Sequence, residues 1–199
     1  MSHVHRDDTG SKMAMWLFIF TEILLFGGLF VTYVVYRYLH QEAFHLAGEE
    51  LDVAIGTINT IILLISSATI AMSITALQQN RKKLSLFFIG ATIVLAAIFL
   101  VNKYFEWGAK FEHGLYPGSE SLAELGYGDI LFFGLYFFMT GLHAFHIIVG
   151  MVVLGFMFYY VYKGRLTHDN FQLLENGGLY WHLVDLIWIF LFPLFYLIH

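Results

Sequence analysis

Five long apolar runs, separated by short polar segments, dominate the sequence. We expect these runs to form helices over residues 13–39, 53–77, 84–105, 129–162 and 179–198. At a rise of about 1.5 Å per residue, helices of this length cross a hydrocarbon core of roughly 30 Å. The pattern predicts an all-α polytopic membrane protein, with a short tail over residues 1–12 and one bundle of five transmembrane helices over residues 13–199.

Composition agrees with the membrane interpretation and excludes several classes of protein. Hydrophobic residues make up 59% of the 199 residues and charged residues 13%, whereas soluble domains carry about 25% charged residues. The chain has no cysteine, which excludes disulfides, thiolate metal sites and cysteine nucleophiles. It has no basic stripe and no short catalytic or phosphate-binding motif, so we expect no catalytic residue and no nucleic-acid partner.

The distribution of Lys and Arg predicts the side of the membrane on which each terminus lies. Five spans place the termini on opposite sides, and positive residues favour the cytoplasm. On the side of the membrane that holds the N-terminus, the segments contain seven such residues: Arg6, Lys12, Arg81, Lys82, Lys83, Lys163 and Arg165. On the other side they contain three: Arg37, Lys103 and Lys110. We therefore expect a cytoplasmic tail at the N-terminus and a C-terminus on the outer side.

Ionisable side chains inside the predicted spans are the candidate functional residues. They are Glu22, His143, His146, His182 and Asp185. Glu22 lies about 14 Å along the first helix, near mid-membrane, where its charged form costs a few kcal/mol. The three-residue spacing within each of the pairs His143–His146 and His182–Asp185 puts the two members on one helix face.

These depths predict a cluster between helices. His146 is expected at the depth of Glu22, so we expect it to share a proton with that carboxyl, which lowers the cost of burial. Asp185 is expected about 9 Å past Leu179, nearer the cytoplasmic side. It is a further candidate member of the cluster.

Three interpretations of these buried groups stay open from the residues alone. They form a structural cluster that fixes helix packing, or a group that handles protons, or ligands of a haem or metal through a pair such as His143 with His182. The histidines sit among Phe and Trp, whereas haem pairs usually come with glycines opposite the macrocycle. We therefore expect no metal ligand and no cofactor in this chain.

Charged residues near the helix ends suggest surface contacts. Glu106 follows the predicted end of the third helix, and we interpret it as an interfacial residue. Lys163 and Arg165 follow the fourth helix on the expected cytoplasmic face, where basic residues attract anionic lipid headgroups. We expect both to contact a phospholipid phosphate.

Five segments carry a resemblance to a known family. They are Met15-Trp16-Leu17-Phe18-Ile19-Phe20-Thr21-Glu22, Asn59-Thr60-x-x-Leu63-Leu64-x-Ser66-Ser67, Tyr104-Phe105-Glu106, Thr140-Gly141-x-His143-x-x-His146-x-x-x-Gly150 and Tyr180-Trp181-His182-x-Val184-Asp185-x-x-Trp188. Together they resemble subunit III of the haem–copper cytochrome c oxidases, with Thr21 in place of the usual Ser. The resemblance covers nearly the whole chain after the first dozen residues, and the last two segments are long and specific.

The resemblance implies a non-catalytic subunit of a respiratory terminal oxidase in the bacterial cytoplasmic membrane, with the C-terminus periplasmic. Haem and copper then belong to partner subunits. Subunit I is the main contact, subunit II and a small subunit IV are further partners, and membrane lipids bind between the helices. Such a subunit supports proton uptake and protects the enzyme during turnover. Its buried glutamate, Glu22 here, reacts with carbodiimides. Other members have two further N-terminal helices, so this chain resembles a short, five-helix form.

Related functions remain as alternatives. The chain also resembles subunit III of quinol oxidases, but members of that branch often have Asp at the position of Glu22. A subunit associated with nitric oxide reductases is a further relative. A b-haem electron carrier is the alternative from a different class, and a Soret band that follows this polypeptide alone would indicate it.

The charge distribution yields the first testable prediction. A reporter fused after Lys83 should be active as a cytoplasmic fusion, and one fused at His199 as a periplasmic fusion, because Lys and Arg favour the cytoplasmic side. Alkaline phosphatase and green fluorescent protein fusions measure this. Periplasmic activity after Lys83 would reverse the orientation.

Overall fold

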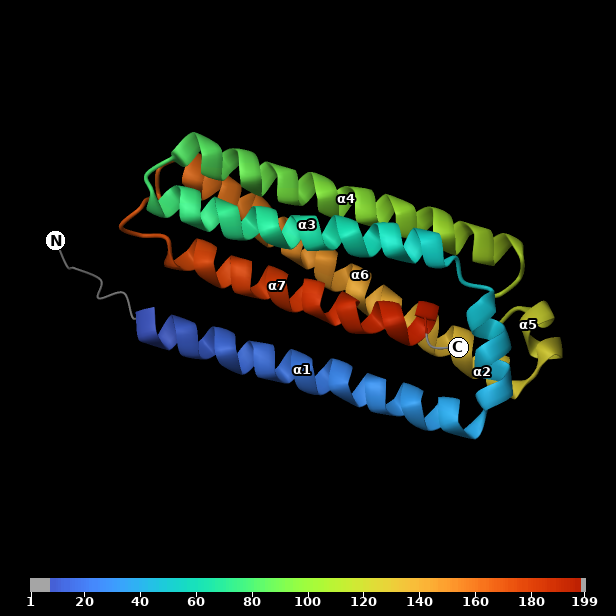
Figure 1. The fold of residues 1–199 in the computed structure, drawn as a ribbon. Helices are drawn as coiled ribbons and strands as arrows, with labels where there is room; N and C mark the ends of the chain where they lie inside the picture. The colour runs from blue at the N-terminus through green and yellow to red at the C-terminus, as the bar shows by residue number, and fades with distance from the viewer. Residues whose placement is uncertain (1–7, 198–199) are drawn as a thin grey trace.

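The computed structural model describes residues 8–197, which form a bundle of long helices with no strand in that range (Figure 1). Five helices are long and apolar enough to span a membrane: α1 (Asp8–Leu39), α3 (Val53–Gln78), α4 (Lys82–Glu112), α6 (Tyr127–Tyr162) and α7 (Gln172–Phe192), the last continuing as a π-helical turn, Pro193–Leu197. Two short helices, α2 (Gln41–Glu49) and α5 (Glu120–Leu125), lie at one end of the bundle. The predicted all-α class and the number of spans are confirmed. Residues 1–7 of the predicted tail lie outside the described residues.

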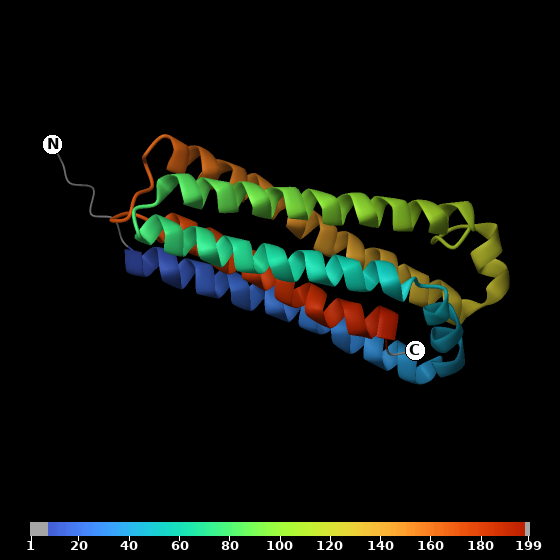
Figure 2. The same cartoon turned by 45° about the horizontal axis from the view of Figure 1, so that its top comes forward.

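The central helix of the bundle is α7. In Figure 1, α3 and α1 flank it on opposite sides and α6 lies behind it. In the most apolar 18-residue stretch of each helix, 56% of the residues are buried in α7 and 11% in α1. Helix α1 is therefore peripheral. The α3–α4 turn, the α6–α7 loop and the start of α1 gather at one end of the bundle, and α2 and α5 lie at the other (Figures 1 and 2).

Three spanning helices are longer than the sequence suggests. Helix α1 begins at Asp8, five residues before the predicted start, so the last part of the predicted tail is helical. Helix α4 continues about two turns past Phe105 to Glu112, because charged residues stop a hydrophobic run without stopping a helix. Helix α7 begins seven residues before Leu179, so it also includes Gly177 and Gly178. Glycine allows close packing here: a Cβ on Gly178 would lie 2.7 Å from the Ile74 side chain of α3. The earlier start also moves Asp185 about 20 Å from the beginning of α7, near its middle.

The polar segment between the first two predicted spans contains a short helix, α2. In α2 the buried residues are Phe44, Ala47 and Gly48, while the acidic residues face outward. The Phe44 ring meets the rings of Tyr33 and Phe132 edge-on, each at 5.4 Å between centroids. This amphipathic helix closes the end of the bundle.

Large aromatic residues of α7 fit against small residues of its neighbours. The indole N–H of Trp181 donates to Ser66 and that of Trp188 donates to Thr60, both on α3 and both at 3.0 Å. On the α6 side, a Cβ on Gly150 would lie 2.8 Å from the Trp181 ring. Close packing of small residues is a main source of helix association in lipid.

This packing predicts the effect of a single methyl group. Gly150→Ala should destabilise the folded protein by about 1–3 kcal/mol, because the new Cβ overlaps a fully buried indole. The matched control is Gly155→Ala on the same helix, where nothing lies within 4 Å of the added Cβ. Thermal unfolding midpoints in one detergent compare the two variants. Equal midpoints would show that the Gly150 contact is unimportant.

Candidate functional site

Glu22 of α1 and His146 of α6 form a hydrogen-bonded pair. Nε2 of His146 lies 3.0 Å from Oε2 of Glu22, and the two side chains are 10% and 13% exposed. The other ring nitrogen, Nδ1, lies 2.7 Å from the carbonyl oxygen of Leu142. That oxygen only accepts hydrogen bonds, so Nδ1 carries a hydrogen.

This geometry determines how the pair holds protons. If the imidazole is neutral, Nε2 is an acceptor and Glu22 must be the protonated partner; otherwise an imidazolium faces a carboxylate. In both forms one proton lies between Nε2 and Oε2, and the pair has no net charge. The rings of Phe26 and Phe145 meet the imidazole edge-on at 5.4 and 5.8 Å. The contact expected between Glu22 and His146 is present.

His143 lies one turn away but contacts different helices. Its ring is fully buried and stacks on Trp188 of α7 at 5.2 Å, and it meets Phe99 of α4 edge-on at 5.7 Å. Neither ring nitrogen has a hydrogen-bond partner among the described residues. The two histidines are therefore not directed at one common neighbour, as their spacing suggested: His146 contacts α1, and His143 contacts α4 and α7.

His182 and Asp185 of α7 do not join the Glu22 pair. Nδ1 of His182 lies 2.7 Å from the Ser67 hydroxyl of α3. Asp185 is 3% exposed, and neither of its carboxyl oxygens has a hydrogen-bond partner in the described part of the chain. Because α3 and α1 lie on opposite sides of α7 (Figure 1), groups that face α3 do not reach Glu22. This corrects the expectation that Asp185 belongs to the same cluster.

A second buried cluster, which we call the outer cluster, consists of Lys103, Glu106, Tyr136 and Tyr196. The Lys103 ammonium donates to Glu106 at 3.2 Å, to Tyr136 at 3.1 Å and to Tyr196 at 2.9 Å. Both tyrosine hydroxyls donate to Oε1 of Glu106, that of Tyr136 at 2.5 Å. The cluster joins α4, α6 and the C-terminal turn, and it satisfies both charges internally.

The outer cluster corrects the interpretation of Glu106 as an interfacial residue. Its side chain is 3% exposed and that of Lys103 is 4% exposed. The residue was placed at a helix end because the apolar run stops there, but α4 continues past it. The spacing of Lys103 and Glu106 is a signal that could have found the ion pair. The tyrosines come from distant segments, and nothing in the sequence distinguishes them from the other ten.

Lys163 and Arg165 lie at the end of α6, where both are exposed. The Lys163 ammonium lies 5.8 Å from the Tyr159 ring, and the Arg165 guanidinium lies 5.7 Å from the Tyr160 ring. At the same end, Lys82 of α4 donates to the Tyr162 carbonyl at 2.8 Å. Three basic residues therefore share one end of the bundle.

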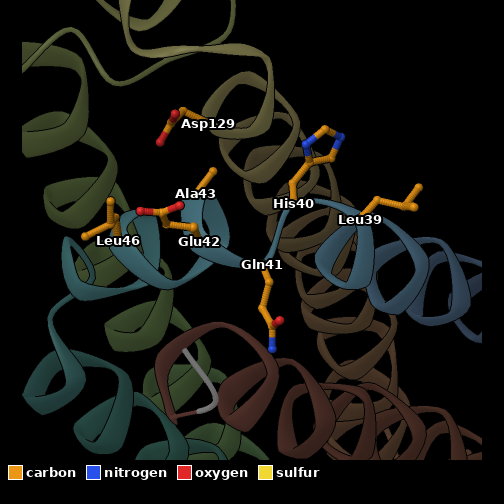
Figure 3. Close-up of a pocket in the computed structure, with 7 residues that line it drawn as sticks. All are labelled: Leu39, His40, Gln41, Glu42, Ala43, Leu46 and Asp129. Atoms are coloured by element: carbon orange, nitrogen blue, oxygen red, sulfur yellow. The ribbon is translucent and has the colours of Figure 1, made fainter.

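Several cavities lie apart from these buried groups. One of about 420 Å³ is at the outer bend between α1, α2 and the start of α6 (Figure 3). It is lined by Leu39, His40, Gln41, Glu42, Ala43, Leu46 and Asp129. Across residues 8–197 no group of three or more His, Asp or Glu side chains is arranged to hold a metal ion.

The geometry defines the chain as a multi-pass helical membrane protein with ionisable groups paired across its helices. The protein is a member of the cytochrome c oxidase subunit III family, whose model matches residues 2–199. The family is that of haem–copper oxidase subunit III, a non-catalytic subunit of the oxidase complex.

Individual relatives carry three different names. The chain is 28% identical to "Cytochrome c oxidase subunit 3" of Thermostichus vulcanus over all of this chain and 92% of that protein. It is 29% identical to "Probable quinol oxidase subunit 3" of Staphylococcus saprophyticus, over 94% of this chain and 89% of the relative. It is 28% identical to "Heme-copper oxidase subunit I+III" of Aeropyrum pernix over 94% of this chain, which spans only 22% of that longer protein.

The outer cluster yields a double-variant prediction. Lys103→Met and Glu106→Gln should each destabilise the protein by roughly 3–5 kcal/mol, because each leaves a buried group without its ionic partner. The double variant should cost much less than the sum of the two. Denaturant unfolding in detergent measures all three.

The exposed Lys12–Glu175 pair is the control, with side chains 54% and 36% exposed. Lys12→Met should change stability by less than about 1 kcal/mol. Strictly additive effects of the Lys103 and Glu106 substitutions would refute the coupling.

Proposed function

We propose that this chain is subunit III of a respiratory haem–copper terminal oxidase in the bacterial cytoplasmic membrane. It stabilises catalytic subunit I and supports proton uptake there, without a redox centre of its own. The cytoplasmic end of the bundle is the one with the α3–α4 turn, because Lys and Arg concentrate there. The Aeropyrum relative, whose name joins subunits I and III, supports direct contact with subunit I.

The Glu22–His146 pair is the observation that carries the proton-handling role. It holds one proton between two groups that are nearly out of contact with solvent. No hydrogen bond of the described residues links this pair to the outer cluster, so the pair is a local proton store and not part of a continuous path across this chain. We infer that Glu22 tunes and stabilises the enzyme and does not carry every proton.

Further partners follow from the same proposal. Subunit II and a small subunit IV complete the complex, and the haem and copper belong to partner subunits. Phospholipid headgroups bind at the basic end of the bundle, where Lys163 and Arg165 are exposed and Lys82 is close. Lipid density beside either residue would support this contact.

A quinol oxidase is the second candidate complex, because a relative with that name is as similar as the cytochrome c oxidase relative. Glu22 favours the cytochrome c oxidase. Oxygen consumption by the purified complex with reduced cytochrome c or with quinol separates the two. Co-purification of this chain with a haem- and copper-containing polypeptide tests the shared proposal. A native chain free of any haem protein would refute it.

Substitutions at Glu22 test the role of the pair. Glu22→Gln should keep the fold and most of the initial oxygen consumption, since the amide still donates to Nε2 of His146, and it should abolish carbodiimide labelling of this chain. Glu22→Ala should reduce the yield of assembled complex further, because it leaves His146 unpaired and a small void. Oxygen-consumption rate and label incorporation are measured on the same preparations.

Glu175→Gln is the matched control, because that carboxyl is 36% exposed and lies near the basic end of the bundle. It should change neither rate nor labelling. Complete loss of turnover in an assembled Glu22→Gln complex would make Glu22 an obligatory proton carrier and refute the supporting role.

A further inference from the structure

Asp185 is a buried carboxyl outside both clusters. It shares one face of α7 with Trp181 and Trp188, which lie four residues before it and three after it. Both indoles donate to hydroxyls of α3, so this face is turned toward α3 and the bundle interior. Asp185 is 3% exposed, and neither oxygen accepts a hydrogen bond from a described residue.

The surroundings of Asp185 favour the neutral acid. A carboxylate at this burial, with no ion pair and only the Ser67 hydroxyl beside it, costs several kcal/mol, and retaining the proton avoids that cost. Lys103 offers no compensation, because it is already bound to Glu106 and two tyrosines. Asp185 therefore differs from Glu106, whose charge is balanced.

Two side chains connect Asp185 with the outside of the bundle. The Ser67 side chain of α3 lies beside the Asp185 carboxyl. The same hydroxyl lies 2.7 Å from Nδ1 of His182. Unlike Asp185, both Ser67 and His182 are only half-buried. A small rotation of the Ser67 hydroxyl is enough to face either neighbour.

We propose that Asp185 is a proton-binding site in the core of the bundle, and that Ser67 and His182 exchange its proton with the outside. In the uptake direction, Nδ1–H of a His182 imidazolium gives its proton to the Ser67 oxygen while the Ser67 hydroxyl gives its own to the Asp185 carboxylate. Imidazolium and carboxylate become neutral imidazole and neutral acid, and Ser67 is unchanged. Release is the reverse.

This site goes beyond the proposed function and does not depend on it. It uses neither Glu22 nor His146. Its hydrogen bonds face α3, and in Figure 1 α3 and α1 flank α7 on opposite sides. Hydrocarbon supplies no protons, so Nε2 of His182 must meet water or a polar group of a neighbouring subunit. His143 is not on this route, because its ring stacks on Trp188 and bonds to no described residue.

Infrared spectroscopy of the complex as isolated from its native membrane tests the proposal. In a Glu22→Gln background, the spectrum should contain the carbonyl band of a protonated carboxylic acid at neutral pH. Asp185→Asn should remove the band, and Asp185→Glu should shift it. After transfer to D₂O the band should move as the proton exchanges. Ser67→Ala and His182→Phe should each slow that exchange by at least about tenfold, because each breaks the hydrogen-bonded route.

The matched control is Thr69→Val, which removes a buried hydroxyl from the same helix that bonds Thr92 instead. It should leave the exchange rate unchanged. A band unaffected by both Asp185 substitutions would show that Asp185 is ionised and overturn the site. If Ser67→Ala and His182→Phe both leave the proton-exchange rate unchanged, the proposed route is wrong. It is also wrong if Thr69→Val slows the exchange equally. The assay measures a carboxyl band and not turnover. Its result therefore tests the Asp185 site even if the complex proves not to be an oxidase.

Discussion

The constraint on which this structure depends is that the hydrocarbon core offers no water to polar side chains. A buried charged group is therefore stabilised by pairing with a group of another helix, and each such pair specifies a neighbour. Glu22 and His146 join α1 to α6. Lys103 and Glu106 join α4 to Tyr136 of α6 and to the C-terminal turn. Apolar packing alone, which is similar on many helix faces, would not select these neighbours so narrowly.

Small residues then determine how closely the selected helices approach. Gly150 leaves room for the Trp181 ring, and Gly178 leaves room for Ile74. These positions allow α7 to be central although it carries two buried tryptophans. Polar pairs and close contacts of small residues therefore occur at the same helix interfaces. A substitution that disturbs one also disturbs the other. Asp185 and His143 differ from these pairs: their surroundings are closely packed, yet neither side chain has a hydrogen-bond partner among the described residues.

The sequence predicted what depends on length and depth along one helix. Five apolar runs give five spans, and the depth of Glu22 in the first run selects His146 as its neighbour. The predictions that were wrong depend on where a helix ends and on how the helices are arranged around each other. Glu106 was misplaced because an apolar run ended before its helix did. The separation of Asp185 from Glu22 follows from α7 lying between α3 and α1, which spacing within a helix does not encode. Tyr136 and Tyr196 come together with Lys103 only in the folded bundle.

The position of α1 has a consequence for biosynthesis. Within this bundle α1 comes before the other spans along the chain, yet it packs mainly on α6 and α7, which come last. The Glu22 carboxyl has no partner until His146, 124 residues further along the chain, has been synthesised. At ordinary translation rates this takes roughly 6–25 s. Until then α1 must be held by the insertion machinery or stay in lipid as a lone helix with a neutral Glu22. The tyrosine that ties α1 to the C-terminal turn, Tyr33, bonds the Leu194 carbonyl. Docking of α1 is therefore complete only after the C-terminal turn of the bundle has been made.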